Sequence, residues 1–211
     1  PTLAAMHGHV AIGHCRYSTT GSTTWENAQP VFRNTSAGTG VALGHNGNLV
    51  NTAELAARAR EMGLIDVRNG RAATTDSDIL GALLAHGAAD STVERAALEL
   101  LPTVRGAFCL TFMDENTLYA ARDPYGVRPL SLGRLDRGWV VASETAALDI
   151  VGASFVRDIE PGELLAIDAD GVRSTRFANP NPKGCVFEYV YLARPDSVIA
   201  GRSVHKARVD I

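Results

Sequence analysis

Cysteine is scarce in this chain of 211 residues, which carries only Cys15, Cys109 and Cys185, far apart from one another. An odd, scattered set of thiols argues against a disulfide framework and indicates a reducing compartment, so we expect a cytoplasmic protein. Long apolar runs are also lacking, since none approaches the roughly 20 residues that a membrane helix needs. The first residues hold no basic region followed by an apolar core, which excludes a signal peptide. We therefore expect no membrane partner.

A surplus of charge of either sign is missing too: the net charge is −3, with 20% charged and 45% hydrophobic residues. Because no basic stripe is present, nucleic-acid binding has no electrostatic support. The composition is that of a globular protein with one well-filled core, or with one domain and a piece of another. The chain begins at Pro1 rather than methionine and stops at Ile211 inside a helical pattern. We expect it to be an internal segment of a longer protein.

The order of the predicted elements indicates a layered α+β domain with helices outside stacked sheets. An early strand over 9–14 is followed by three amphipathic helices, then by an antiparallel meander. The helices are expected over 51–62, about 75–84 and 91–101, and the later strands over 106–113, 117–121, 128–132, 138–142, 154–158, 163–168 and 172–176, with a short helix over 144–150.

A Pro- and Asn-rich stretch, Asn179 to Gly184, is the clearest linker signal in the chain. We place a domain boundary there, which gives a first domain over 1–179 and a second segment over 180–211. Beyond the linker the pattern predicts a strand over 185–192, a turn over 194–197 and a helix from about 203.

The Gly44–Leu49 stretch, GHNGNL, invites two interpretations. Asn-Gly is the strongest short signal for a β-hairpin turn. However, Asn51 and Glu54 stand at capping-box spacing and predict that a helix follows. A turn between a strand and a helix can direct a side-chain amide and a backbone N–H at one point, and two such donors make an oxyanion hole.

Two charged residues have a structural and a functional interpretation. Arg16 is either a solvated arginine in a polar loop or a two-pronged donor to a carboxylate. Asp76 lies in the sequence TTDSD before an apolar run, where Thr75, Asp76 or Ser77 can simply cap a helix. A carboxylate held there can instead accept hydrogen bonds from a substrate ammonium.

A metal site at His7, His9 and His14 is not favoured. His7 and His9 would share one face of a strand, but His14 has the opposite parity. No cysteine or carboxylate completes a four-ligand set at short spacing. Cys109 lies in a continuous apolar strand and is most simply a core residue.

Six ordered motifs resemble the glutaminase half of the amidophosphoribosyltransferase family, within the class II glutamine amidotransferases that use an N-terminal cysteine nucleophile. They are GHCRYSTTG at 13–21, GHNGNL at 44–49, TTDSDIL at 74–80, ARDPYGVRPL at 121–130, VASETAALD at 141–149 and FEYVYLARPDS at 187–197. Asn48-Leu49 and the EYVYLARPDS stretch favour this family over related glutaminases such as glucosamine-6-phosphate synthase.

The resemblance implies a four-layer αββα sandwich of the N-terminal-nucleophile hydrolase type, here incomplete at its N-terminus. It also implies that Asn46 (side-chain amide) and Gly47 (backbone N–H) form the oxyanion hole. Arg16 would hold the α-carboxylate of glutamine and Asp76 its α-ammonium. Tyr17 and Thr19 would lie in the loop that folds over the substrate.

The implied reaction of the parent enzyme is the first committed step of purine synthesis. Glutamine, phosphoribosyl pyrophosphate and water give 5-phosphoribosylamine, glutamate and pyrophosphate. The family's terminal cysteine does the first step, with its own α-amino group as base. Position 1 is Pro1, and Cys15 has no free amine. We therefore expect the isolated segment to be inactive.

The resemblance has further implications for cofactors and partners. Mg²⁺ would act in a phosphoribosyltransferase half outside this segment, and the segment itself needs no cofactor. Cys185 matches a ligand of the [4Fe–4S] cluster in one branch of the family, but cluster-free members can carry cysteine there too. Four thiolates are needed, so both alternatives stay open. The family implies a homo-oligomer, a tetramer.

Two other functions remain alternatives. The chain could be the glutaminase domain of another class II amidotransferase, or a non-catalytic module that binds glutamine or serves a structural role. An upstream reading frame with a terminal cysteine would separate an enzyme from such a module.

Overall fold

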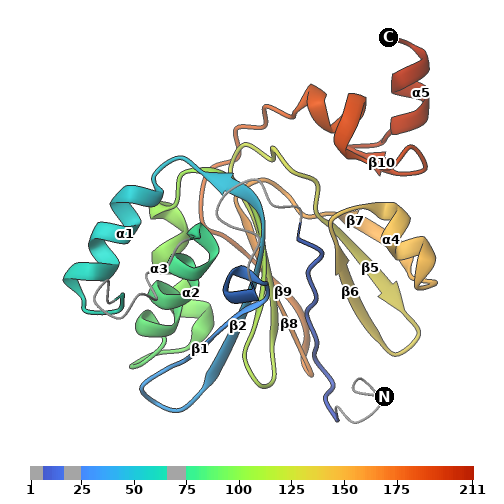
Figure 1. The fold of residues 1–211 in the computed structure, drawn as a ribbon. Helices are drawn as coiled ribbons and strands as arrows, with labels where there is room; N and C mark the ends of the chain where they lie inside the picture. Colours follow the sequence, from blue (N-terminus) through green and yellow to red (C-terminus); the bar gives the residue numbers. More distant parts are fainter. Residues whose placement is uncertain (1–6, 17–24, 66–74) are drawn as a thin grey trace.

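A six-stranded antiparallel sheet forms the centre of the computed structural model, which describes residues 7–16, 25–65 and 75–211 (Figure 1). Its strand order is β1-β2-β3-β4-β8-β9. The strands are β1 (Val31–Asn34), β2 (Gly40–Leu49), β3 (Gly106–Met113), β4 (Leu118–Arg122), β8 (Glu163–Asp168) and β9 (Gly171–Arg176). β3 pairs with β4 and β8 with β9, but the strands between β4 and β8 lie in a second sheet, so the predicted antiparallel meander is divided between two sheets.

Three helices cover one face of this sheet: α1 (Thr52–Glu61), α2 (Asp76–Gly87) and α3 (Val93–Leu100), with a short 3-10 turn η4 (Leu101–Thr103) after α3. In Figure 1 they form a separate layer beside the sheet. Leu43, Leu80, Phe108 and Leu164 belong to the apolar core between the two layers, and each is almost fully buried. Burial of such side chains stabilises the fold by about 1.5–3 kcal/mol each.

A second, three-stranded sheet packs against the opposite face, with the order β6-β5-β7. Its elements are β5 (Ser131–Leu135), β6 (Gly138–Ala142) and β7 (Ser154–Asp158), and helix α4 (Thr145–Ile150) follows β6. Side chains alternate along β5. Leu132 joins Leu165 and Ile167 of the large sheet in the core between the sheets, and the Cα of Gly133 faces Leu148 of α4.

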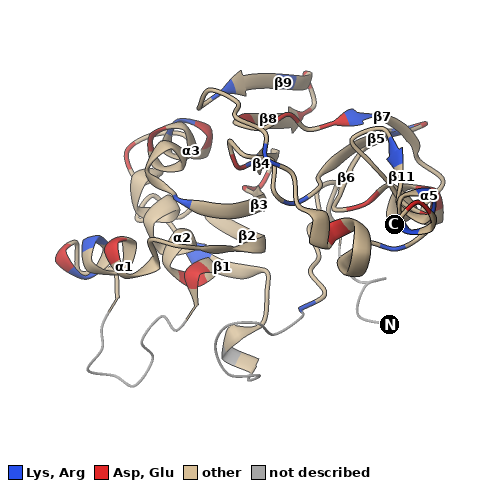
Figure 2. Ribbon diagram, turned by 90° about the horizontal axis from the view of Figure 1, so that it is seen from above, with Lys and Arg blue, Asp and Glu red and all other residues tan. Residues whose placement is uncertain are grey.

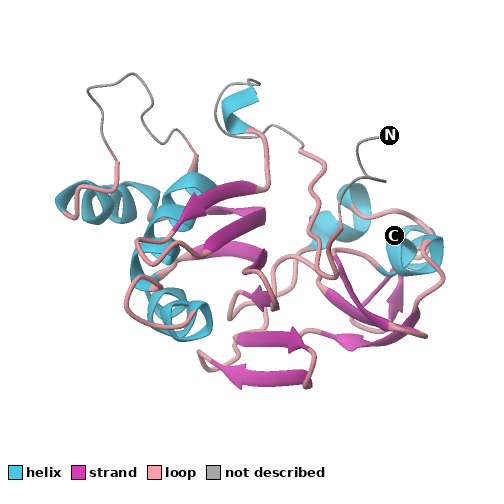
Figure 3. Cartoon of the chain, turned by 90° about the horizontal axis from the view of Figure 1, so that it is seen from below, coloured by secondary structure: helices cyan, strands magenta, loops and turns pink. Residues whose placement is uncertain are grey.

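The layer order is therefore helices, sheet, sheet, helix, which confirms the predicted αββα sandwich of mixed helices and antiparallel sheets. Figure 3, from below, shows the two sheets beside one another with helices on their outer sides. Figure 2 shows acidic and basic residues interspersed over both halves. Among the described helices, none combines the length and apolar character that crossing a membrane would require.

The segment 185–192 was predicted as a strand, and that prediction is wrong. It is helical: η5 (Glu188–Leu192) is a π-helical turn, and Phe187 stacks on Tyr191 four residues later, with ring centroids 5.2 Å apart. Aromatic and β-branched composition favours strands only where a sheet edge accepts them. The elements that follow are β10 (Val198–Ile199), β11 (Arg202–Ser203) and α5 (Val204–Val209).

Other local predictions also need correction. The segment 9–14 is extended but pairs with no strand of the described residues, and in Figure 1 it passes between the two sheets. Asn51 makes no capping bond, because its amide joins Thr103 O and Arg105 N–H instead. Helix α3 begins later than the predicted residue 91, because Thr92 is its N-cap and accepts from Arg95 N–H.

The proposed boundary near residue 180 remains a prediction. The stretch itself is held to the loop after β4, because Asn181 N–H donates to Pro124 O (2.8 Å) and Lys183 N–H to Tyr125 O (2.9 Å).

Candidate active site

The GHNGNL stretch lies inside a strand and not in a turn. Asn46 pairs with Cys109 and Gly47 with Phe108 in the β2–β3 ladder, which continues to Leu49. The hairpin interpretation is wrong, and so is the prediction of a turn between a strand and a helix within this stretch. The strand is longer than expected because β3 offers a partner for every residue up to Leu49.

Gly47 is a position in this ladder where only glycine fits. Its φ is +154°, and an added Cβ would lie 2.0 Å from the carbonyl oxygen of Ala107. No real Cβ comes so near a backbone atom, and that oxygen belongs to the neighbouring strand. The close approach presses the Gly47 backbone against β3.

The N–H of Gly47 points away from β3. Its partner Phe108 donates its own N–H to Asp123 Oδ2 (3.2 Å) and accepts from Asp123 N–H at its carbonyl (2.8 Å). The 47–108 pair is therefore of the non-hydrogen-bonded kind, in which both backbones direct their polar groups outward.

Two neighbouring N–H groups of β2 point to the same edge and have side-chain acceptors. His45 N–H donates to Gln29 Oε1 (2.7 Å), and Leu49 N–H to Asp76 Oδ2 (3.3 Å). The pairing of β1 with β2 reaches no further than Leu43. The Gly47 N–H thus faces an edge of β2 that β1 does not cover, between two satisfied donors.

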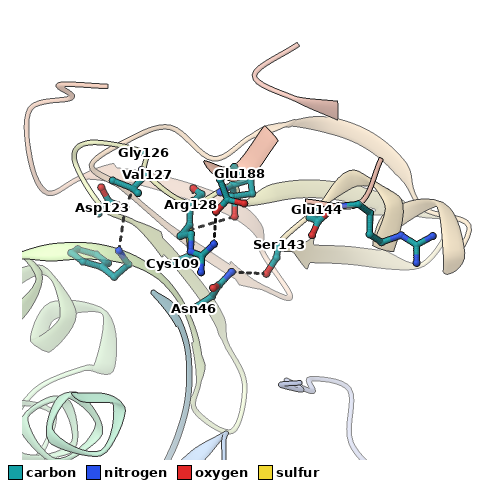
Figure 4. A network of polar contacts seen from close by, with 12 residues as sticks. Asn46, Cys109, Asp123, Gly126, Val127, Arg128, Ser143, Glu144 and Glu188 are labelled. Atoms are coloured by element: carbon teal, nitrogen blue, oxygen red, sulfur yellow. Dashed lines mark hydrogen bonds and ion pairs between the residues drawn. The ribbon is translucent and has the colours of Figure 1, made fainter. Parts of the chain in front are cut away.

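The side chain of Asn46 lies on the face of β2 opposite to that of His45, and it points toward the second sheet. Its Nδ2 lies 3.4 Å from Ser143 Oγ, just after β6, so the amide spans the gap between the two sheets (Figure 4). Asn46 and Gly47 both line a cleft of about 400 Å³. That volume is within the range of roughly 300–1,000 Å³ typical of small-molecule sites.

The same cleft contains Arg16 and Asp76, so four of the six predicted site residues come together. They arrive from the segment before β1, from β2 and from the start of α2, and only the fold brings them side by side. The other two, Tyr17 and Thr19, lie outside the described residues.

Arg16 is partly buried at the cleft, and its Nη1 donates to the carbonyl of Asn27 (3.0 Å). This bond fixes one edge of the guanidinium to the chain. A guanidinium anchored in this way presents a planar, permanently charged donor to an anion.

Asp76 opens α2, and Thr75 is its N-cap, accepting from Asp78 N–H (3.3 Å). The carboxylate of Asp76 accepts from the N–H groups of Ser77 (2.8 Å) and Leu49 (3.3 Å). Burial would raise its pKa, but the contact with His45 and these N–H groups together hold the pKa below the usual value. Asp76 is thus a fixed anion, suited to accept an ammonium.

His14 lines the cleft beside these charges. Burial lowers the pKa of its imidazole, and the nearby His45 and Arg16 lower it further. The ring is therefore neutral at pH 7, so the permanent positive charges at the cleft are those of Arg16 and Arg128. Arg128 and Glu144 are bonded to the C-terminal segment, whereas Arg16, Asp76 and the N–H donors of Asn46 and Gly47 together match an α-amino acid with a polar carbonyl in its side chain.

Sequence reasoning missed the residues that tie the cleft to the C-terminal segment. Arg128 lines the cleft, and its Nη1 donates to the buried Glu188 (2.5 Å). Glu144 also lines it and accepts from Arg194 N–H (2.8 Å) and Ser197 Oγ (2.6 Å). Figure 4 shows this network around Asn46. Each contact joins residues at least 50 positions apart, so no local pattern reveals it.

The cysteines differ in their surroundings. Cys15 is exposed at the cleft, Cys109 is buried with its thiol pKa raised by burial, and Cys185 is half-buried. In the described ranges no three His, Cys, Asp or Glu side chains gather as a metal site would require. The residues around Cys185 therefore do not by themselves fit an iron–sulfur cluster, which needs four thiolates.

Comparisons with known proteins show to which family the chain is similar. A family model described as "Glutamine amidotransferase domain" matches residues 14–150. An amidophosphoribosyltransferase of Mycobacterium tuberculosis is 90% identical over 210 residues, covering 100% of this chain and 40% of that protein. An amidophosphoribosyltransferase of Bacillus subtilis is 40% identical, with 99% and 43% covered.

A solved structure of the glutamine phosphoribosylpyrophosphate amidotransferase of B. subtilis, complexed with ADP and GMP, is also similar. The TM-score is 0.83 at 39% identity, with 92% of this chain and 41% of that chain covered. The chain thus spans about two fifths of the length of the relatives it matches.

Proposed function

Because the chain belongs to the glutamine amidotransferase domain family, we propose that it is the glutamine-binding part of an amidophosphoribosyltransferase. The observation that carries this proposal is the convergence of Asn46 and Gly47 on a cleft that also holds Arg16 and Asp76. The whole-chain similarity to amidophosphoribosyltransferases supports the choice of parent reaction.

Each group of glutamine has a counterpart in this cleft. Arg16 pairs with the α-carboxylate, and Asp76 accepts hydrogen bonds from the α-ammonium. The side-chain carbonyl oxygen lies between the Asn46 amide and the Gly47 N–H. These two donors strengthen their bonds as negative charge develops on that oxygen, so they act mainly in the transition state.

The nucleophile of the proposed reaction is a terminal cysteine of the longer protein. Its thiolate attacks the side-chain carbonyl carbon of glutamine, and its α-amino group takes the thiol proton and passes it to the departing ammonia. Water then hydrolyses the thioester to glutamate. The ammonia displaces pyrophosphate from phosphoribosyl pyrophosphate in a further domain and gives 5-phosphoribosylamine.

Other parts of the proposal concern the longer protein. Mg²⁺ acts in the phosphoribosyltransferase half, and the glutamine site uses no cofactor. A cluster with Cys185 as one ligand, a tetrameric assembly and a cytoplasmic location remain predictions from the resemblance. The alternatives, another class II glutaminase or a non-catalytic module, predict no glutamine-dependent formation of 5-phosphoribosylamine.

The test is Arg16→Lys in the full-length protein. Lysine keeps the charge but loses the two-pronged geometry, and charged hydrogen bonds contribute about 1.5–3 kcal/mol each. The KM for glutamine should rise by roughly 10- to 100-fold, while synthesis from free ammonia is unchanged. Arg95→Lys, on the exposed side of α3, is the matched control and should change neither.

An equal change in glutamine- and ammonia-dependent rates would assign Arg16 a structural role. Absence of glutamine-dependent synthesis in the unsubstituted full-length protein would refute the proposed function itself.

A further inference from the structure

His45 stands beside the two proposed oxyanion donors and has no role in the reaction described so far. Its side chain is only 1% exposed. It lies on β2 next to Asn46, and its register partner in β3 is Leu110 of the core beneath the helices. A histidine on such an apolar face needs a physical reason.

One edge of the imidazole meets the start of α2. Nδ1 of His45 lies 3.5 Å from Oδ2 of Asp76. The same oxygen accepts from Leu49 N–H at 3.3 Å. The ring and the β2 backbone therefore hold one carboxylate oxygen from two sides, which leaves the carboxylate little freedom to turn.

The other edge of the ring lies against Gly47. Nε2 of His45 is buried and has no hydrogen-bond partner among the described residues. A Cβ built on Gly47 would lie only 2.9 Å from Nε2. Leaving a buried nitrogen unpaired costs free energy that an apolar side chain would avoid. A histidine at this position therefore lowers the stability of the fold relative to an apolar ring, but it provides the contact of Nδ1 with Asp76, which an apolar ring lacks.

These contacts make His45 a bridge between Gly47 and Asp76. In the proposed function, on which this inference rests, Gly47 N–H meets the side-chain carbonyl of the substrate and Asp76 meets its α-ammonium. The separation of these two points decides how many methylenes fit between them. Asparagine has one methylene fewer than glutamine.

We propose that His45 is a positioning and specificity-determining residue, whose imidazole sets the spacing between the Gly47 backbone and the Asp76 carboxylate and so selects glutamine over asparagine. His45 is among the residues that line the cleft, but its side chain is only 1% exposed, so it acts through the two residues that it spaces.

The experiment uses the full-length protein and two substitutions that divide the two contacts. His45→Phe keeps the ring but loses Nδ1, whereas His45→Asn can still donate to Asp76 but loses the ring that lies on Gly47. His86→Asn, on the exposed last turn of α2, is the matched control. Steady-state kinetics with glutamine and asparagine, ammonia-dependent synthesis and melting temperature are measured for each.

For His45→Phe we expect the KM for glutamine to rise about tenfold or more with a smaller change in kcat, because Asp76 is loosened. For His45→Asn we expect the ratio of kcat/KM for glutamine to that for asparagine to fall at least threefold. One methylene is worth about 10- to 200-fold in an apolar site, so a partial loss is readily measured. Ammonia-dependent synthesis and the control variant should not change.

An unchanged glutamine-to-asparagine ratio in His45→Asn would overturn the proposal. So would a His45→Phe protein that fails to fold, because His45 would then be a structural residue. If the unsubstituted protein hydrolyses no glutamine, the proposed function fails. If it does and both variants match it, this inference alone fails.

Discussion

Gly47→Ala tests the backbone geometry on which the oxyanion hole depends. The added methyl carbon would lie 2.0 Å from Ala107 O and 2.8 Å from Ala107 C. Neither atom can yield without moving β3, whose pairing with β2 and β4 forms the centre of the large sheet. The clash therefore forces the Gly47 peptide out of position.

The magnitude follows from two contributions. A non-glycine residue at an unfavourable positive φ costs about 1–3 kcal/mol. The steric clash adds about 1–3 kcal/mol more, the usual cost of forcing extra atoms into a packed site. We expect a loss of unfolding free energy of about 2–6 kcal/mol.

Gly63→Ala is the matched control, since Gly63 also has a positive φ of +71° but no atom within 4 Å of the added Cβ. It should lose only the conformational contribution, about 1–2 kcal/mol. The assay is urea denaturation of the 211-residue chain, together with glutamine turnover in the full-length protein. Turnover in Gly47→Ala should fall by about 10²-fold or more. Equal stability losses in the two variants would refute the argument that β3 crowds Gly47.

Two further predictions concern Asp76 and Cys15. Because the pKa of Asp76 is lower in the folded than in the unfolded state, its ionised form stabilises the fold above about pH 4, and this stabilisation is lost as the pH falls through the lower folded pKa. In Asp76→Asn, the unfolding free energy should therefore fall less steeply as the pH is lowered below about pH 4. An unchanged dependence of the unfolding free energy on pH in this range would contradict a stabilising, ionised Asp76. The 211-residue chain should release no ammonia from glutamine, measured against a blank. Release that Cys15→Ser abolishes would instead make Cys15 a nucleophile.

The sequence predicted the positions of the helices because amphipathic spacing is local, but the caps expected for α1 and α3 were wrong. Thr75 was among the expected caps and does cap α2. Strand limits were less certain, since they depend on partners elsewhere in the chain. Asn46 and Gly47 show this most clearly: they were expected beyond a strand, but β3 extends β2 past them.

The sequence predicted which residues line the site, but not the contacts and orientations of their side chains and backbone groups. Arg16, Asn46, Gly47 and Asp76 do share one cleft. Other residues of the cleft are held by contacts between distant parts of the chain, such as those of Arg128 with Glu188 and of Glu144 with Ser197. The orientation of the Gly47 N–H also required the register, because it follows from the hydrogen bonds of Phe108.

The central claim is that Asn46 stabilises negative charge in the transition state, and Asn46→Ala in the full-length protein tests it most directly. Ser143→Ala is the control, because it removes the side-chain partner of Asn46 and leaves its amide in place. The melting temperature, the Kd for glutamine and kcat are measured for both variants.

The oxyanion role predicts that Asn46→Ala folds, binds glutamine nearly as well, and turns over about 10²–10³-fold more slowly, equivalent to about 3–4 kcal/mol. Ser143→Ala should keep most of its turnover. A folded Asn46→Ala protein with near-normal turnover, or a Ser143→Ala protein that loses as much, would contradict the claim.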